Sequence, residues 1–315
     1  MSIEERTAFN TSASAEIWEW VESIRHRRST PDPSPLLMGI LNVTPDSFYD
    51  GGKFNRVTQG VEQGLRLLEE GADILDIGGE STRPPGKEYG AGSVSVSVQE
   101  EIDRVVPVIE AIIAQRSDAV ISIDTMKPEV ARAAVQSGAS LINDVSAGEY
   151  DESIWQVAAE ADIPCVLMHG HNPGNRVPID QITYDNVVDE ILSYLTARVA
   201  KARERGVRKP IIDPGIGFAK GGEDSARIIR ELQQFTGLGL PILAGASRKA
   251  FIGRILGGAG PEERLYGTLA AHGAAVLNGA TILRLHDVRA AADFFNVFTR
   301  LLADPLLFTE DFREG

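Results

Sequence analysis

Eight short apolar segments recur along the chain, and a stretch with helical periodicity follows each of them. Most of these segments do not alternate apolar and polar residues, which is typical of strands buried on both faces of a parallel sheet. They are Leu36–Val43, Ala72–Gly79, Ala119–Thr125, Leu141–Ser146, Pro164–His169, Pro210–Gly215, Pro241–Ser247 and Thr281–Asp287. Between them, apolar side chains recur three and four residues apart, as on the buried face of a helix. The clearest such stripes are Val61, Leu65, Leu68; Ile102, Val105, Val106, Ile109, Ile112, Ile113; and Val288, Ala292, Phe295, Phe298, Leu302.

An unbroken alternation of eight strands and helices predicts an α/β fold, a (β/α)8 TIM barrel. The alternative is an open, doubly wound sheet, but no predicted strand leads into the G-x-G-x-x-G turn found in many such folds. We expect residues 35–315 to form this catalytic domain and residues 1–34 to be an N-terminal extension. In the extension, Trp18, Trp20 and Val21 predict a short helix packed on the barrel, and Ser29–Pro35 is typical of a linker.

The composition narrows the choice of partners. The chain has 315 residues, 43% of them hydrophobic, and a formal net charge of −14, which disfavours binding to nucleic acid or to an anionic membrane. Cys165 is the only cysteine, so the chain can form neither an internal disulfide nor a cysteine metal cluster. Residues 1–20 lack a signal-peptide pattern, and no apolar run is long enough to span a bilayer. We therefore expect a cytoplasmic protein that binds neither nucleic acid nor a membrane.

Polar residues stand at the end of nearly every predicted strand. In a TIM barrel the catalytic residues come from the C-terminal ends of the strands. Each polar residue could instead cap the following helix, as Thr125 and Asp287 are placed to do. Polar residues at the ends of eight strands on one rim favour an active site. The residues concerned are Asn42, Asp76, Glu80, Asp124, Asn143, His169, Asp213, Ser247–Lys249, Arg284 and His286.

Two subsets of this rim suggest different ligands. Carboxylate and amide groups suit a flat heterocycle with several N–H donors and carbonyl acceptors, and Asp124, Asn143 and Asp213 supply them. The first and last strands become neighbours when a barrel closes, which brings Asn42 close to Arg284 and His286. Two cations beside an amide oxygen suit a departing diphosphate with Mg²⁺. Zinc is not favoured, because the sequence offers no cluster of His and Cys residues to bind it. We expect Arg284 and His286 to act on the diphosphate and to leave ring binding unchanged.

Two long segments follow the first two predicted strands, at residues 44–52 and 81–87. Long segments in a compact barrel are usually functional. Phe48, Pro84 and Pro85 would give them an apolar surface able to cover an aromatic ring.

The motifs of the rim resemble, in the same order, those of dihydropteroate synthases, and the resemblance covers residues 36 to about 302. They are Asn42-Val-Thr-Pro-Asp-Ser-Phe-Tyr-Asp-Gly-Gly52, Asp76-Ile-Gly-Gly-Glu-Ser-Thr-Arg-Pro84, Asp124-Thr125, Asn143-Asp144, Met168-His169, Asp213-Pro-Gly-Ile-Gly-Phe218, Ser247-Arg-Lys249 and Arg284-Leu-His286-Asp287.

This resemblance implies a transferase with two small-molecule substrates, which joins 6-hydroxymethyl-7,8-dihydropterin diphosphate to p-aminobenzoate. It also implies Mg²⁺ as cofactor and a homodimer. In this family the diphosphate leaves first and the arylamine then attacks the pterin-methyl cation, so no enzyme nucleophile is needed. The roles implied are Asp124, Asn143, Asp213 and Lys249 for the pterin; Asn42, Arg284 and His286 for the diphosphate, with Asn42 also on the metal; Phe48, Thr82, Pro84, Phe218 and Ala250 for p-aminobenzoate; and Asp50, Arg83 and Lys249 as catalytic residues.

Four positions depart from the usual family pattern, and all four concern the arylamine side. They are Ala250 in place of a serine, Gly170-His-Asn-Pro173 after the fifth strand, Ala219-Lys-Gly-Gly222 after Phe218, and the additional Pro85. Two other functions stay open, namely a methyltetrahydrofolate:corrinoid methyltransferase and a pterin-binding scaffold without catalysis. The diphosphate-directed motifs at Ser247–Lys249 and at Arg284 and His286 favour the synthase over both.

Overall fold

The computed structural model describes residues 12–26, 34–44, 53–80, 96–170 and 182–302. Within these ranges, eight parallel strands pair in the order β6-β5-β4-β3-β2-β1-β8-β7. A further parallel bridge between Ile212 and Ile242 joins the two ends of this series and closes the barrel. The strands are β1 (Leu36–Asn42), β2 (Ile74–Gly78), β3 (Ile121–Asp124), β4 (Leu141–Asp144), β5 (Cys165–Met168), β6 (Pro210–Asp213), β7 (Leu243–Ala244) and β8 (Ile282–Leu285).

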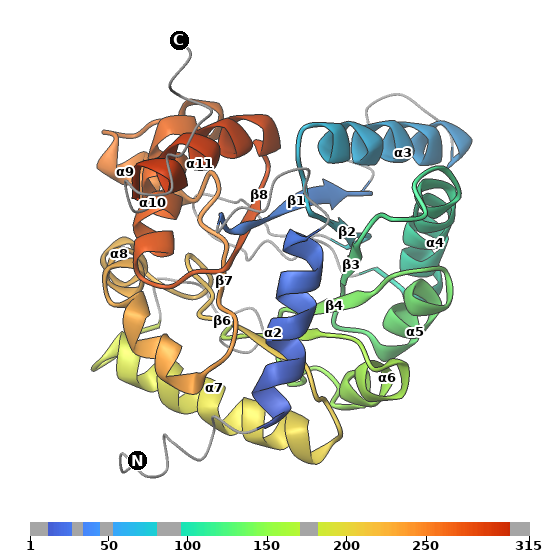
Figure 1. Ribbon diagram of the computed structural model, residues 1–315, viewed down its shortest axis with the longest axis horizontal. Helices are drawn as coiled ribbons and strands as arrows, with labels where there is room; N and C mark the ends of the chain where they lie inside the picture. The colour runs from blue at the N-terminus through green and yellow to red at the C-terminus, as the bar shows by residue number, and fades with distance from the viewer. Residues whose placement is uncertain (1–11, 27–33, 45–52, 81–95, 171–181, 303–315) are drawn as a thin grey trace.

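The helices surround these strands as a ring (Figure 1). The (β/α)8 TIM barrel is therefore confirmed, and each predicted strand is present, although shorter than predicted. None of the helices in the described ranges is both long and apolar enough to cross a membrane. They are α3 (Lys53–Glu69), α4 (Val98–Gln115), α5 (Pro128–Gln136), α6 (Ser153–Ala161), α7 (Val187–Glu204), α8 (Gly222–Arg230), α9 (Ala250–Ile255), α10 (Leu265–Leu277) and α11 (Val288–Leu302), with 3-10 turns η3 (Leu232–Leu238) and η4 (Pro261–Glu263).

Helix α2 (Ser12–Arg25) lies across the centre of the ring in Figure 1. Its buried face is formed by Ile17, Val21 and Ile24, spaced four and three residues apart. Trp18 is only partly buried and donates from Nε1 to Gly239 O at 2.9 Å, shortly before β7. The predicted helix thus covers the N-terminal end of the barrel. The division of the chain at residue 35 stays a prediction, and most of the expected linker lies outside the described residues.

Candidate functional site

Asp76 is the centre of a polar network inside the barrel. It lies on β2 and is fully buried. Its Oδ1 atom accepts a hydrogen bond from Ser122 Oγ at 2.7 Å, and Oδ2 accepts from Asn143 Nδ2 at 3.0 Å and from Arg284 Nε at 2.5 Å. These partners come from β3, β4 and β8. A cluster of this kind in a barrel interior, which is normally filled by apolar side chains, indicates a functional role.

Arg284 also pairs with Asp124, the last residue of β3, through Nη2 and Oδ2 at 2.6 Å. Burial raises the pKa of Asp124 above its ordinary value, although the Arg284 charge opposes this shift. Burial alone would lower the pKa of Arg284, but the two carboxylates raise it, so the guanidinium stays charged. Arg284, expected on the diphosphate, thus contacts a carboxylate of the ring subset, and the division of the rim between the two ligands stays a prediction.

The second carboxylate oxygen of Asp124 differs from the first. Asp124 is 4% exposed, and Oδ1 is buried without a hydrogen-bond partner among the residues that the structure describes. A buried acceptor normally has a partner, since leaving it unsatisfied costs about 1–3 kcal/mol. Asp124 therefore offers a hydrogen-bond acceptor to a ligand in the barrel mouth.

Asp213, the last residue of β6, is held by the turn that follows it. Its Oδ1 atom accepts from Gly215 N at 2.7 Å, and burial raises its pKa to about 6. Gly215 has a φ of +68°, and a Cβ atom there would lie 2.0 Å from His169 O. Only glycine fits this turn, because both the backbone angle and the carbonyl at the end of β5 exclude a side chain.

The same turn carries Phe218, which lies under the ammonium group of Lys249. The distance from Lys249 Nζ to the centroid of the ring is 3.7 Å, a favourable cation–π geometry. Lys220, 2% exposed, donates from Nζ to Phe218 O at 2.8 Å and to His169 O at 2.9 Å. Burial lowers the pKa of Lys220 to about 7. Lys220 thus fixes the backbone next to Phe218. Ala250 is buried and begins α9 directly after Lys249.

His286 follows β8 and is held by Ser247 from the end of the seventh unit. Ser247 Oγ lies 3.0 Å from His286 Nδ1 and accepts from His286 N at 3.2 Å. Burial lowers the pKa of His286 to about 4, and the charge of Arg284 adds to this effect. At neutral pH His286 is therefore neutral, and it would reach a phosphate oxygen as a hydrogen-bond donor. Its expected role toward the diphosphate stays a prediction.

Arg248, which lies between Ser247 and Lys249 in the sequence, adopts a left-handed backbone conformation with a φ of +56°. Such a conformation costs about 1–3 kcal/mol for a residue with a side chain. It is held by a bidentate pair with Asp287 at 3.0 and 2.7 Å and by a hydrogen bond from Arg248 N to Thr268 Oγ1 at 3.0 Å. The turn that places Ser247 and Lys249 is therefore rigidly supported.

Asn42, at the end of β1, pairs in register with Gly78 of β2. A Cβ atom on Gly78 would lie 3.8 Å from Asn42 Oδ1 and 3.7 Å from Asp124 Oδ2, which places Asn42 beside the pair of Asp124 and Arg284. In the described ranges, no group of three or more His, Cys, Asp or Glu side chains could hold a metal ion. Mg²⁺ commonly takes one or two protein oxygens and completes its shell with phosphate and water. Asn42 fits that kind of site.

Comparison with known proteins agrees with this geometry. Residues 38–286 match the family model described as "Pterin binding enzyme". The chain belongs to the pterin-binding enzyme family. A dihydropteroate synthase from Synechocystis is 44% identical over 264 residues, which is 83% of this chain and 88% of that protein.

Solved structures of family members are similar as well. The dihydropteroate synthase of Xanthomonas albilineans with 4-aminobenzoic acid is 45% identical, with a TM-score of 0.78 over 86% of this chain and 94% of that one. The same enzyme in complex with 7,8-dihydropteroate gives 43% identity and a TM-score of 0.75, over 86% of this chain and 95% of that one. The pterin-binding family and the barrel are thus shown from both sequence and structure.

Several predicted site residues of this pterin-binding enzyme lie outside the described residues, so their roles stay predictions. They are Phe48, Asp50, Thr82, Arg83 and Pro84. The described residues Asp124, Asn143 and Arg284 lie in one network, Lys249 contacts Phe218, and His286 contacts Ser247.

Three residues that organise the site have no individual role in the sequence prediction. Asp76 was one of many polar rim residues, Lys220 was only a departure from the family pattern, and Ser247 was only part of a motif. The positions of Asp76 and Ser247 at strand ends indicated that they could belong to the site. Nothing in the sequence indicated that Lys220 is buried. The expected cap at Thr125 is also wrong, since α5 follows Lys127 and Thr125 Oγ1 accepts from Lys127 N at 3.2 Å before the helix begins.

Proposed function

We propose that this protein is a dihydropteroate synthase, which condenses 6-hydroxymethyl-7,8-dihydropterin diphosphate with p-aminobenzoate. The observation that carries the proposal is the buried, unsatisfied Oδ1 atom of Asp124 inside the Asp76 network. Dihydropterin has ring N–H and amino groups that need acceptors in a dry site. Asp124 and Asp213 supply carboxylate oxygens to them, and Asn143 supplies an amide.

The diphosphate binds where β8 and β1 meet. Arg284 brings a charge that burial does not remove, and His286 brings a neutral N–H donor held by Ser247. When bound, Mg²⁺ would be held by Asn42 together with phosphate oxygens and would stabilise the negative charge that develops on the leaving group. This arrangement favours breaking the C–O bond between the pterin methyl carbon and the diphosphate.

The arylamine binds on the opposite side of the methyl carbon, against Phe218 and Lys249. The Lys249 ammonium close to the Phe218 ring gives this side one flat apolar surface and one positive charge. Thr82, Pro84, Phe48 and Ala250 complete this part of the proposal.

The reaction needs positioning and electrostatics more than covalent participation. As the C–O bond breaks, the electron pair leaves with the diphosphate, and positive charge spreads over the pterin ring. The nitrogen of p-aminobenzoate then forms the new C–N bond and releases its proton to solvent or to the departing diphosphate. The buried carboxylates Asp124 and Asp213 stabilise the cationic ring at the stage when it forms.

A reconstitution assay tests the proposal. Purified protein receives the pterin diphosphate, p-aminobenzoate and Mg²⁺, and 7,8-dihydropteroate is measured by mass spectrometry while each component is omitted in turn. We expect product only in the complete mixture. A scaffold would bind a pterin without product, and a methyltransferase would not consume the diphosphate, so either outcome would refute the synthase. The homodimer is also proposed here, on the family resemblance alone.

A further inference from the structure

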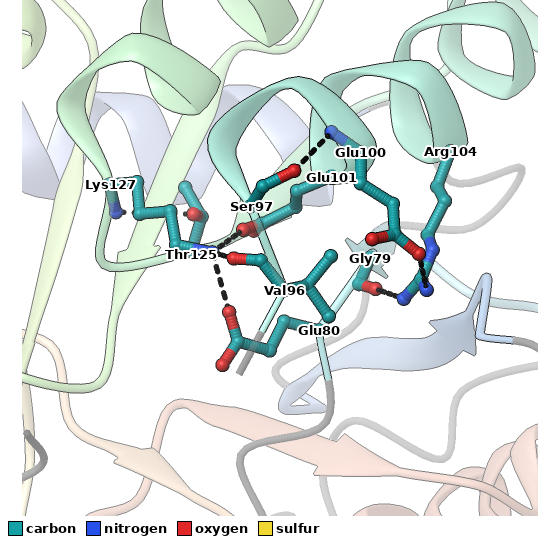
Figure 2. A network of polar contacts seen from close by, with 9 residues as sticks. All are labelled: Gly79, Glu80, Val96, Ser97, Glu100, Glu101, Arg104, Thr125 and Lys127. Atoms are coloured by element: carbon teal, nitrogen blue, oxygen red, sulfur yellow. Dashed lines mark hydrogen bonds and ion pairs between the residues drawn. The ribbon is translucent and has the colours of Figure 1, made fainter. Parts of the chain in front are cut away.

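A buried cluster of one ammonium and two carboxylates lies next to the site, between the ends of β2 and β3 (Figure 2). Lys127 Nζ donates to Glu80 Oε2, Glu101 Oε2 and Val96 O, each at 2.6 Å. An ammonium group has three N–H donors, so these three contacts use all of them. Lys127, Glu80 and Glu101 are 5%, 8% and 1% exposed.

Two of these three partners flank one segment of the chain. Glu80 directly precedes residues 81–95, and Val96 directly follows them. Because both oxygens lie 2.6 Å from the same nitrogen, they are no more than twice that distance apart. The ends of a flexible chain of this length would be separated by about 20 Å on average. Lys127 therefore joins the two ends of the segment at one point.

The third partner does not border the segment. Glu101 lies on α4, one turn after its start. Burial raises the pKa of Glu101, and the hydrogen bond from Lys127 opposes this shift. Burial alone would lower the pKa of Lys127, but its bonds to Glu101 and Glu80 raise it, so the ammonium stays charged at neutral pH.

The cluster fixes the relative positions of its side chains more than it stabilises the fold. Buried ion clusters usually stabilise a fold no better than apolar side chains of the same volume, but they impose fixed distances and directions. The surroundings of the cluster are fixed independently. Arg104 Nη1 donates to Gly79 O at 2.6 Å, and Ser97 Oγ caps α4 by accepting from Glu100 N at 3.2 Å (Figure 2). What Lys127 adds is the connection between the residues at the two ends of the segment.

We propose that Lys127 is a positioning residue for the p-aminobenzoate step, acting through Glu80 and Val96 on residues 81–95. This inference rests on the proposed function, in which Thr82, Arg83 and Pro84 contribute to the arylamine step. Ring binding does not depend on Lys127, because Asp124 is held by the pairing of β3 with its two neighbours and by Arg284.

Two matched substitutions test the role. Glu80→Met and Glu101→Met each remove one carboxylate from the same ammonium, and each leaves a charge-balanced buried pair. Glu80→Met should raise the KM for p-aminobenzoate about tenfold, because small displacements of positioning groups have large kinetic effects. The Kd of a pterin analogue should stay unchanged in both proteins, and Glu101→Met should leave the KM for p-aminobenzoate near the wild-type value. Lys127→Met should repeat the Glu80→Met pattern if the protein folds.

A second measurement does not depend on catalysis. Lysine-specific protease can cut after Lys87, within the segment, and after Lys201 in α7, which reports general unfolding. In native protein, Glu80→Met should increase cleavage after Lys87 about tenfold relative to Glu101→Met, with equal cleavage after Lys201.

The inference is overturned by equal effects of the two substitutions on the KM for p-aminobenzoate, by a parallel loss of pterin affinity, or by equal cleavage after Lys87. If the wild-type protein does not condense the two substrates, the proposed function fails, and the arylamine role of Lys127 fails with it. The protease comparison would still decide whether the contact between Glu80 and Lys127 holds the segment.

Discussion

Replacing Asp124 by asparagine should separate ligand binding from stability. The change keeps the size of the side chain and removes its charge. In the wild-type protein Oδ2 pairs with Arg284 at 2.6 Å and Oδ1 is a buried, unsatisfied acceptor. The amide can keep only one acceptor oxygen. If that oxygen faces Arg284, the amide N–H₂ group faces the N–H donors of the pterin.

The size of the effect follows from the bond that is lost. A hydrogen bond to a charged group contributes about 1.5–3 kcal/mol, which corresponds to a loss of affinity of about 10- to 150-fold. Stability should change little. The folded-state pKa of Asp124 lies above its unfolded value, so ionisation of this carboxyl costs stability at neutral pH, and asparagine removes that cost. Arg284 keeps its pair with Asp76.

Calorimetry with a pterin analogue and thermal unfolding measure the two quantities, with Asp144→Asn as the control. Asp144 is also buried, at the end of β4, but its oxygens accept from Ser146 N at 2.9 Å and Gly148 N at 2.6 Å. This control should lose about 1–3 kcal/mol of stability and keep its pterin affinity. Wild-type affinity in Asp124→Asn, or an equal loss of affinity in the control, would refute the assignment.

Further predictions concern the other parts of the site. Burial raises the pKa of Asp213 to about 6, so affinity for a pterin analogue should fall as the pH falls through this value. Binding titrations of Asp213→Asn should show affinity reduced at least about tenfold and a weaker dependence on pH. Arg284→Ala and His286→Ala should each slow diphosphate release about 10²-fold in single-turnover experiments, and wild-type release rates would contradict both roles. Only Arg284→Ala should also weaken pterin binding, because Arg284 contacts Asp124. Ala250→Ser should lower the KM for p-aminobenzoate severalfold, through one added hydrogen bond to its carboxylate, and leave the KM for the pterin diphosphate unchanged; an unchanged or raised value would mean that the carboxylate is bound elsewhere.

The fold was predictable because strands buried on both faces leave uninterrupted apolar runs in the sequence. Strand lengths were less predictable. The run Pro241–Ser247 contains only the two-residue strand Leu243–Ala244, since the chain leaves the sheet toward the left-handed turn at Arg248. Apolar character extends into that turn because Ala246 is buried outside the sheet.

The polar rim was predictable for a topological reason, because the C-terminal ends of all strands in a parallel barrel lie at one end. The pairings within it were not. Arg284 contacts Asp76 and Asp124 across 208 and 160 residues of sequence, and nothing local indicates which carboxylates a given arginine will meet. Lysine is usually a surface residue, so the sequence does not indicate that the side chains of Lys127 and Lys220 are buried. The neutral state of His286 follows from its burial and from the nearby charge of Arg284, and neither is visible in the sequence.

An isotope experiment tests the central claim most directly. The pterin diphosphate is prepared with ¹⁸O in the oxygen that bridges the methyl carbon and the first phosphorus, and is turned over once with p-aminobenzoate. If the account is correct, the C–O bond breaks, all label appears in diphosphate, and 7,8-dihydropteroate forms in an equal amount. Label in 6-hydroxymethyl-dihydropterin, with no arylamine product, would mean cleavage at phosphorus and would contradict the synthase.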